Sequence, residues 1–375
     1  MRELFAANGP RGNGLLAAPT VNVGVVGLGY WGPNLLRVLA DMDGVEVAWM
    51  CDRDSERLAR LARRYPAVRC SRAVEDLLDD PSLHAILIAT PVATHFELAA
   101  RSLAAGKHTF VEKPLAPSSA EAEDLLLLAA SRRMALMCGH TFLYSPPVRA
   151  VKQMIDGGEL GDIFFISSSR VNLGLHQRDV SVIWDLGPHD FSILLHWLGE
   201  MPSSVRAVGR DSVVAGVVDV AFITLTFPSG LLANVELSWL APSKLRRTVL
   251  VGSEKMVVYD DGAVEPLRLY DHGVVYRDPE TFGEFHLSYR TGDIVSPRVE
   301  SREPLAAELS DFVACAREGR SMRRHAMLAK NVVRLAEAAD ESVQNGGREV
   351  ALEGSRALGD SRPFSRMAVP ATLVR

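Results

Sequence analysis

Short apolar runs alternate with amphipathic stretches between residues 21 and 140. The runs at 21–27, 45–52, 85–90, 108–113 and 134–140 are typical of strands that are buried on both faces. The intervening segments 33–41, 55–65, 95–106 and 119–133 space their apolar residues as one face of a helix does. This alternation predicts a parallel sheet with helices on both faces.

The pattern changes after Pro146 and Pro147. One helical segment leads into longer strands with fewer helices between them, and helical patterns return at 303–318 and 326–343. Along 231–240, residues alternate between apolar (Leu231, Ala233, Val235, Leu237, Trp239) and polar (Asn234, Glu236, Ser238). A period of two predicts a half-buried strand in a largely antiparallel sheet. The expected fold class is therefore α/β, with a Rossmann-type parallel sheet followed by an α/β domain that has a large, open, mostly antiparallel sheet.

Composition and charge narrow the class of protein. The formal net charge of −5 is spread along the chain without a basic stripe, so we expect no nucleic-acid partner. The longest apolar runs are too short to cross a bilayer, and the first residues lack the pattern of a secretory signal. The four cysteines lie far apart without a CxxC pair, which favours reduced thiols and a cytoplasmic location.

A glycine motif follows the first apolar run. Gly27, Gly29 and Gly32 fit GxGxxG, with Tyr30 and Trp31 between the last two glycines. A strand precedes the motif and a helix follows it, which is the context of a dinucleotide-binding loop. In such a loop the first glycine makes the tight turn, the second lets a pyrophosphate approach the backbone, and the third lets helix and strand pack closely.

The end of the next strand bears on the choice of cofactor. Asp52 lies where a carboxylate accepts hydrogen bonds from the adenosine ribose, and it repels a 2′-phosphate. This favours NAD as the cofactor. Arg53 and Arg57 leave NADP open, since an arginine at this strand end can pair with a 2′-phosphate.

Three further segments contain candidate catalytic groups. They are Thr90 to His95 (TPVATH) and Glu112-Lys113-Pro114, each at a strand end, and Trp184 to Asp190 (WDLGPHD). Oxidation of an alcohol by hydride transfer needs a group that takes the hydroxyl proton and a donor that polarises the oxygen. Asp185 and His189 are four residues apart in a helical segment, so their side chains can share one face.

Together with the glycine motif, these segments resemble the glucose–fructose oxidoreductase and inositol dehydrogenase family, Gfo/Idh/MocA. The resemblance implies that Lys113 contacts the substrate hydroxyl and the nicotinamide ribose, that His189 is the general acid/base, and that Asp185 binds a substrate hydroxyl. It implies that Thr90, Pro91, His95 and Glu112 border the cofactor, and that the bond before Pro114 is often cis. No third residue is spaced to complete a metal site, so we expect none.

The segments 139–149 and 158–163 resemble the branch of the family that acts on nucleotide sugars, including UDP-sugar 3-dehydrogenases. Asn172 and Arg178 are then candidate substrate ligands, and a surface role for each is equally open. Arg246 and Arg247 could meet a diphosphate or form a charged strand edge. The alternatives are an NADPH-dependent 3-ketoreductase of a dTDP-deoxysugar and a free polyol or inositol dehydrogenase.

These assignments give a domain plan. We expect a tail over 1–20, a dinucleotide-binding Rossmann domain over 21–144, a substrate-binding and oligomerisation domain over 145–350, and a tail over 351–375. The resemblance implies that the open sheet forms a homodimer or homotetramer interface. A non-enzymatic NAD-binding regulator would have no chemical need for Lys113, Asp185 and His189 together, which favours an enzyme.

Overall fold

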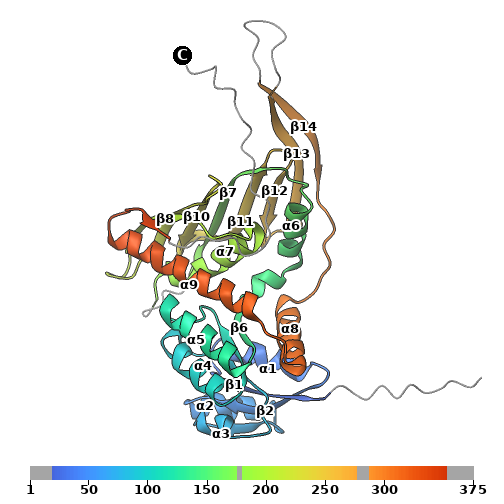
Figure 1. Ribbon diagram of the computed structural model, residues 1–375, viewed down its shortest axis with the longest axis vertical. Coiled ribbons are helices and arrows are strands. Elements are labelled where there is room, and N and C mark those ends of the chain that lie inside the picture. The colour runs from blue at the N-terminus through green and yellow to red at the C-terminus, as the bar shows by residue number, and fades with distance from the viewer. Residues whose placement is uncertain (1–18, 175–179, 277–286, 353–375) are drawn as a thin grey trace, which may run out of the picture.

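The computed structural model describes residues 19–174, 180–276 and 287–352. It contains two sheets, one above the other along the long axis of the molecule (Figure 1). Helices α8 (Pro304–Glu318) and α9 (Arg323–Gln344) lie near the junction of the two. This arrangement is the α/β architecture that the hydrophobic pattern predicts.

The first sheet is parallel, with the strand order β3-β2-β1-β4-β5-β6. Its strands are β1 (Val21–Val26), β2 (Val45–Cys51), β3 (Arg69–Ser71), β4 (Ala85–Ile88), β5 (His108–Glu112) and β6 (Leu136–Gly139). The helical segments on its faces are α1 (Gly32–Ala40), α2 (Ser55–Ala62), α3 (Glu75–Leu78), η1 (Val92–Thr94), α4 (His95–Ala104) and α5 (Ser119–Arg132). The strand order reverses between β1 and β4, so the carboxyl ends of these strands border the crevice where open α/β sheets bind ligands.

The second sheet has nine strands in the order β14-β13-β12-β11-β7-β10-β9-β8-β15, and only the β7–β10 pair within it is parallel. Its strands are β7 (Ile163–Leu173), β8 (Ser204–Arg210), β9 (Val220–Thr226), β10 (Leu232–Ser238), β11 (Leu240–Gly252), β12 (Met256–Asp260), β13 (Leu267–Tyr276), β14 (Leu287–Val295) and β15 (Val350–Ala351). The predicted alternation along 231–240 is confirmed, because Val235, Leu237 and Trp239 are buried while Leu232 and Asn234 are exposed.

The remaining helical segments are η2 (Thr141–Tyr144), α6 (Pro146–Asp156), α7 (Val182–Leu198), α8 (Pro304–Glu318) and α9 (Arg323–Gln344). Helix α7 packs on the inner face of the second sheet. Helix α8, which we expected in the second domain, instead packs against the first, where the Phe312 ring lies 5.7 Å from that of Phe110 on β5. Helix α9 joins the two cores, with Val333 in the first and Leu335 in the second.

The outer face of the second sheet is open among the described residues. Phe165, Phe222 and Leu232 on its central strands are 45%, 47% and 49% exposed, and Leu232 pairs directly with Phe165.

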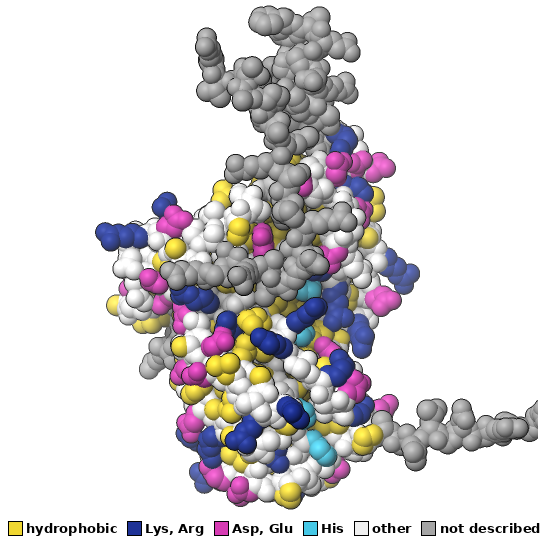
Figure 2. Space-filling view, in the orientation of Figure 1, with side chains coloured by type: hydrophobic (Ala, Val, Ile, Leu, Met, Phe, Trp, Pro, Cys, Tyr) yellow, Lys and Arg dark blue, Asp and Glu magenta, His cyan; other side chains and the backbone are white. Residues whose placement is uncertain are grey.

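No described helix is both long and apolar enough to span a membrane. On the face in Figure 2, basic and acidic side chains are mixed over both domains.

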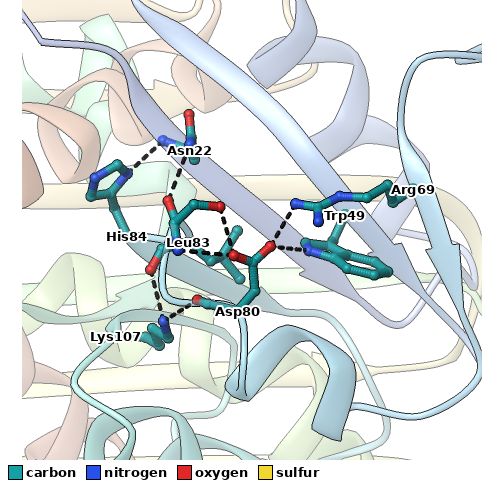
Figure 3. A network of polar contacts seen from close by, with 8 residues as sticks. Asn22, Trp49, Arg69, Asp80, Leu83, His84 and Lys107 are labelled. Atoms are coloured by element: carbon teal, nitrogen blue, oxygen red, sulfur yellow. Dashed lines mark hydrogen bonds and ion pairs between the residues drawn. The ribbon is translucent and has the colours of Figure 1, made fainter.

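A polar network connects the loops at the amino ends of the Rossmann strands (Figure 3). These ends lie on the side of the sheet opposite to the crevice. The Asp80 carboxylate accepts hydrogen bonds from Trp49 Nε1 at 2.7 Å and from Arg69 Nη2 at 2.5 Å. Lys107, which is 5% exposed, donates to the carbonyl oxygens of Asp80 and Leu83. These bonds satisfy polar groups where the loops enter β4 and β5, so we assign the network to stability.

Candidate active site

The glycine loop joins β1 to α1 and leaves room for a ligand on one side. Gly27 has a φ of +91°, and a Cβ there would lie 2.5 Å from the Ala89 carbonyl oxygen. A Cβ on Gly32 would lie 2.0 Å from the Gly27 carbonyl oxygen, so neither position accepts a larger residue. A Cβ on Gly29 would meet only Arg57 Nη1, at 3.8 Å. The loop thus fits the pyrophosphate of a dinucleotide, which would approach at Gly29.

Asp52 holds this loop from the end of β2. Its Oδ2 accepts the Leu28 N–H at 2.7 Å and its Oδ1 accepts the Asp54 N–H at 2.8 Å. A carboxylate has further lone pairs, so these bonds leave room for a ribose hydroxyl. Of the two arginines considered for a 2′-phosphate, both are exposed, and Arg57 Nη1 lies 3.7 Å from Asp52 Oδ2.

The aromatic residues of the loop differ in burial. Tyr30 is 92% exposed, and its ring stacks on Trp31 with the centroids 6.3 Å apart. Trp31 Nε1 and Glu112 Oε1 are both buried, and the indole lies close enough to the Glu112 carboxyl to lower its pKa. Burial raises the pKa of Glu112 to about 7, and the adjacent Lys113 opposes this shift.

The resemblance implies that His95 borders the cofactor, and this stays a prediction. His95 is 0% exposed, and its two ring nitrogens lie 2.8 Å from the carbonyl oxygens of Thr90 and Pro114. Burial lowers the pKa of His95, and a neutral imidazole has a single N–H, so it donates to one of these two carbonyls at the ends of β4 and β5. Thr90 and Pro91 are not buried, and they stay candidates for contact with the cofactor.

Lys113 and Asp185 meet across the junction of the two domains. Lys113 follows β5, and its peptide bond to Pro114 is cis, as the resemblance implies. Lys113 Nζ donates to the carbonyl oxygen of Asp185 at 2.7 Å and to its Oδ1 at 3.1 Å. The other carboxylate oxygen, Oδ2, accepts the Trp239 indole N–H at 3.1 Å. The carboxylate is therefore fixed between the catalytic lysine candidate and the second sheet.

His189 lies one turn after Asp185 in α7. Its ring packs edge-to-face against Phe142, with the centroids 5.1 Å apart. Burial lowers the pKa of His189 well below its usual range, and nearby Lys113, Arg170 and Arg246 lower it further. At neutral pH the imidazole is therefore uncharged and can accept a proton.

The candidate substrate ligands differ in where the structure places them. Asn172 lies on β7, and its buried Oδ1 has no partner among the described residues. Arg178 falls outside the described residues. Arg246 turns to the inner face of the sheet, toward Phe142. In the part of the chain that is described, no group of three His, Cys, Asp or Glu side chains could hold a metal ion.

Sequence reasoning missed the roles of Trp239, Phe142 and Arg170. Trp239 was expected only as a buried strand residue, and its bond to Asp185 spans 54 positions. Phe142 and Arg170 lie beside His189. Phe142 falls within the segment 139–149 that resembles the nucleotide-sugar branch, but that pattern does not say which side chain it packs against, and Arg170 belongs to no motif.

Two family models match consecutive parts of the chain. Residues 21–140 match an oxidoreductase family with an NAD-binding Rossmann fold, and residues 148–258 match the GFO/IDH/MocA C-terminal domain. The two models follow the order of the two sheets.

Curated relatives have different named activities. The chain is 27% identical over 232 residues to 2,7-anhydro-N-acetylneuraminate hydratase of Escherichia coli, a match that covers 58% of this chain and 61% of the hydratase. The match is therefore less than two thirds of that relative's length. UDP-N-acetylglucosamine 3-dehydrogenase of Acidithiobacillus ferrooxidans is 28% identical over 296 residues, which are 78% of this chain and 88% of that enzyme.

Among solved structures, GenD2 from gentamicin A biosynthesis, crystallised in complex with NAD, superposes with a TM-score of 0.77 at 25% identity. The superposition covers 93% of this chain and 100% of GenD2. The expected α/β architecture and the NAD-binding class of the first domain are confirmed. The chain therefore belongs to the Gfo/Idh/MocA family of oxidoreductases.

Proposed function

We propose that this chain is an NAD-dependent dehydrogenase that oxidises a nucleotide sugar of the UDP-glucose type at C3 to a 3-keto sugar. The observation that carries the proposal is the contact between Lys113 and Asp185, one helical turn from the neutral His189. A lysine donor, a fixed carboxylate and a proton acceptor at the carboxyl ends of Rossmann strands suit the oxidation of a secondary alcohol.

Each side chain has one task in this proposal. NAD bound along the glycine loop supplies the hydride acceptor. His189 takes the hydroxyl proton of the substrate, and Lys113 donates a hydrogen bond to the same oxygen as it becomes a carbonyl. Asp185 orients Lys113 and accepts a bond from a neighbouring hydroxyl, while Trp239 fixes the second oxygen of that carboxylate.

The choice of substrate is supported by the nucleotide-sugar pattern at 139–149 and 158–163 and by the similarity to the UDP-N-acetylglucosamine 3-dehydrogenase. A second candidate, an NADPH-dependent 3-ketoreductase of a dTDP-deoxysugar, is favoured by one observation, since Arg57 lies beside both Gly29 and Asp52. A free polyol or inositol dehydrogenase is the third candidate.

We also propose that the chain forms a homodimer or homotetramer through the outer face of its second sheet. The exposed apolar residues Phe165, Phe222 and Leu232 lie on its central strands β7, β9 and β10, where a second copy would cover them.

The substrate is tested by following reduction of NAD and NADP with UDP-glucose, UDP-N-acetylglucosamine, their uronic acids, dTDP-glucose, glucose and myo-inositol. Turnover with a nucleotide sugar and not with free sugars supports the proposal, and the position of the new carbonyl is read by NMR. Turnover with a free polyol alone would reject the nucleotide-sugar substrate.

The catalytic roles are tested with Lys113→Ala and His189→Ala. Each should lower kcat/KM at least about a hundredfold while leaving the Kd of NADH within about twofold, because neither holds the pyrophosphate. Lys255→Ala, a partly exposed lysine paired with Glu159, is the control and should keep full turnover. Near-normal rates in both catalytic variants would contradict the mechanism.

A further inference from the structure

Two arginines face each other directly across neighbouring strands of the second sheet. Arg246 on β11 pairs in register with Arg170 on β7. Like charges at directly opposed positions destabilise a sheet, so such a pair needs a compensating interaction. Both guanidinium groups turn to the inner face, where their Cζ atoms lie 4.6 Å (Arg170) and 5.6 Å (Arg246) from the centre of the Phe142 ring.

Among the described residues, each cation is paired with one carboxylate. Arg170 Nε donates to Asp190, whose other oxygen accepts from Ser168. Arg246 Nη1 donates to Asp261 at 2.9 Å. A guanidinium has five N–H donors, so each arginine keeps donors that these carboxylates do not use.

Burial makes the remaining donors of Arg170 important. Arg170 is 4% exposed, and its Nη1 has no hydrogen-bond partner among the described residues. A buried donor without a partner is unfavourable, and native proteins rarely leave a guanidinium in this state. Arg246, with 32% of its side chain exposed, lies opposite it on the more open side.

The pair also lies next to the proposed reaction centre. The Phe142 ring makes cation–π contacts with both guanidinium groups, and it is in edge-to-face contact with His189. A group bound between the arginines would therefore lie close to His189, on the other side of the Phe142 ring. A planar fork of N–H donors matches a carboxylate or a phosphate better than a neutral hydroxyl.

We propose that Arg170 and Arg246 form a subsite for an anionic group of the substrate, bound beside the carbon that reacts at His189. This inference rests on the proposed function, since the anion belongs to the sugar oxidised there. The shared chemistry is an oxyanion, and it has two sources: a carboxylate on the sugar ring or the diphosphate of a sugar nucleotide.

Arg247 supplies a matched control. It follows Arg246 on the same strand, and successive residues of a strand point to opposite faces. Arg247 is exposed, and its side chain therefore lies on the outer face, away from Phe142. Arg246→Met and Arg247→Met remove the same charge from neighbouring positions, and only the first should affect the subsite.

The experiment compares four ligands that separate the two sources: glucose, glucuronate, UDP-glucose and UDP-glucuronate. For the wild type, Arg246→Met and Arg247→Met, kcat/KM with NAD is measured for each ligand, and the Kd of each is measured on the enzyme loaded with NADH. In the wild type we expect the addition of either the carboxylate or the diphosphate to raise kcat/KM, and to lower Kd, at least about thirtyfold. Arg246→Met should lower that gain at least about tenfold, and Arg247→Met should leave it unchanged.

If the carboxylate produces the gain, the anion is that of a uronic acid. If the diphosphate produces it, the anion is that of the nucleotide. Equal Kd values for charged and neutral ligands, or a gain that survives Arg246→Met, would overturn the subsite. Turnover of neutral sugars without a charge preference would reject the subsite and leave the dehydrogenase proposal intact. An anion preference in Kd without turnover of any ligand would support the subsite and contradict the proposed reaction.

Discussion

His189 lies among cationic side chains that come from several elements. Lys113 approaches from the end of β5, Arg170 from β7 and Arg246 from β11. The His140 imidazole at the end of β6 also faces it, but burial lowers the pKa of His140 to about 3, so that ring is uncharged at neutral pH. Burial disfavours the imidazolium first, and these neighbours disfavour it further. The residue is therefore held in the state that accepts a proton, without a hydrogen-bonded carboxylate of its own.

This environment predicts the acid side of the pH profile. Oxidation needs neutral His189, so kcat/KM falls as pH drops through the pKa of this residue. Because that pKa lies well below the ordinary 6.5, we expect His189 to cause no loss of kcat/KM between pH 8 and pH 6. A change near pH 7 would report Glu112 instead, whose pKa burial raises to about 7. Arg246→Met removes one cation, so it should raise the pKa and move the acid limb to higher pH. A limb near 6.5 that does not move in this variant would contradict the argument.

At this scale the sequence singled out Lys113, Asp185 and His189 as candidates, because strand ends and a four-residue helical spacing can be read along the chain. The structure brings Lys113 and Asp185 into contact, and the catalytic roles stay predictions. The sequence could not identify Trp239 as the partner of Asp185, since that contact depends on how β10 ends beside α7. It also could not show that the buried His95 ring faces two backbone carbonyls. Whether a histidine faces a ligand or two backbone carbonyls is decided by the path of the neighbouring strand ends.

At the scale of elements, the hydrophobic pattern predicted the strands and helices that are long enough to show a period, and it missed the shortest ones. The runs that became β1, β2, β4, β5 and β6 are apolar because helices cover both sides of the sheet. Strand β3 and helix α3 span three and four residues, which is too short for a periodic signal. Their positions depend instead on contacts such as the Asp80 network, which no local pattern reveals.

The Asp80 network should contribute to stability without affecting catalysis. Asp80→Ala removes the acceptor for Trp49 and Arg69, and we expect it to lower the free energy of unfolding by about 1–3 kcal/mol. Because the network lies at the amino ends of the strands, kcat and KM of the folded enzyme should be unchanged (Figure 3). Urea denaturation and steady-state kinetics check both statements. Asp79→Ala, at the exposed neighbouring position, is the control, and an equal loss in both variants would count against the network.

At the scale of the whole molecule, the open sheet predicts self-association. Phe222→Lys combined with Leu232→Lys places two charges on outward positions, so the monomer should still fold while the oligomer dissociates. Light scattering after size-exclusion chromatography measures the mass. Val264→Lys, on an exposed loop after β12, is the control. An unchanged mass in the double variant would show that the interface lies elsewhere.

The division of the chain into two sheets could be predicted from the change in periodicity after Pro147. The placement of α8 and α9 could not, because an amphipathic helix shows that it has a buried face and not which core covers it. The structure assigns α8 to the first core through Leu309 and Phe312, and it places α9 against both.

The return of α8 and α9 to the first core has a consequence for synthesis on the ribosome. The Rossmann strands are complete at Gly139, yet the apolar surface that Leu309, Phe312 and Val333 cover stays uncovered while residues 140–303 are made. That surface is therefore open to solvent while these residues emerge. Domains that complete their cores early can fold as they emerge, whereas this one waits for its last helices and is open to chaperones or misassembly until they arrive.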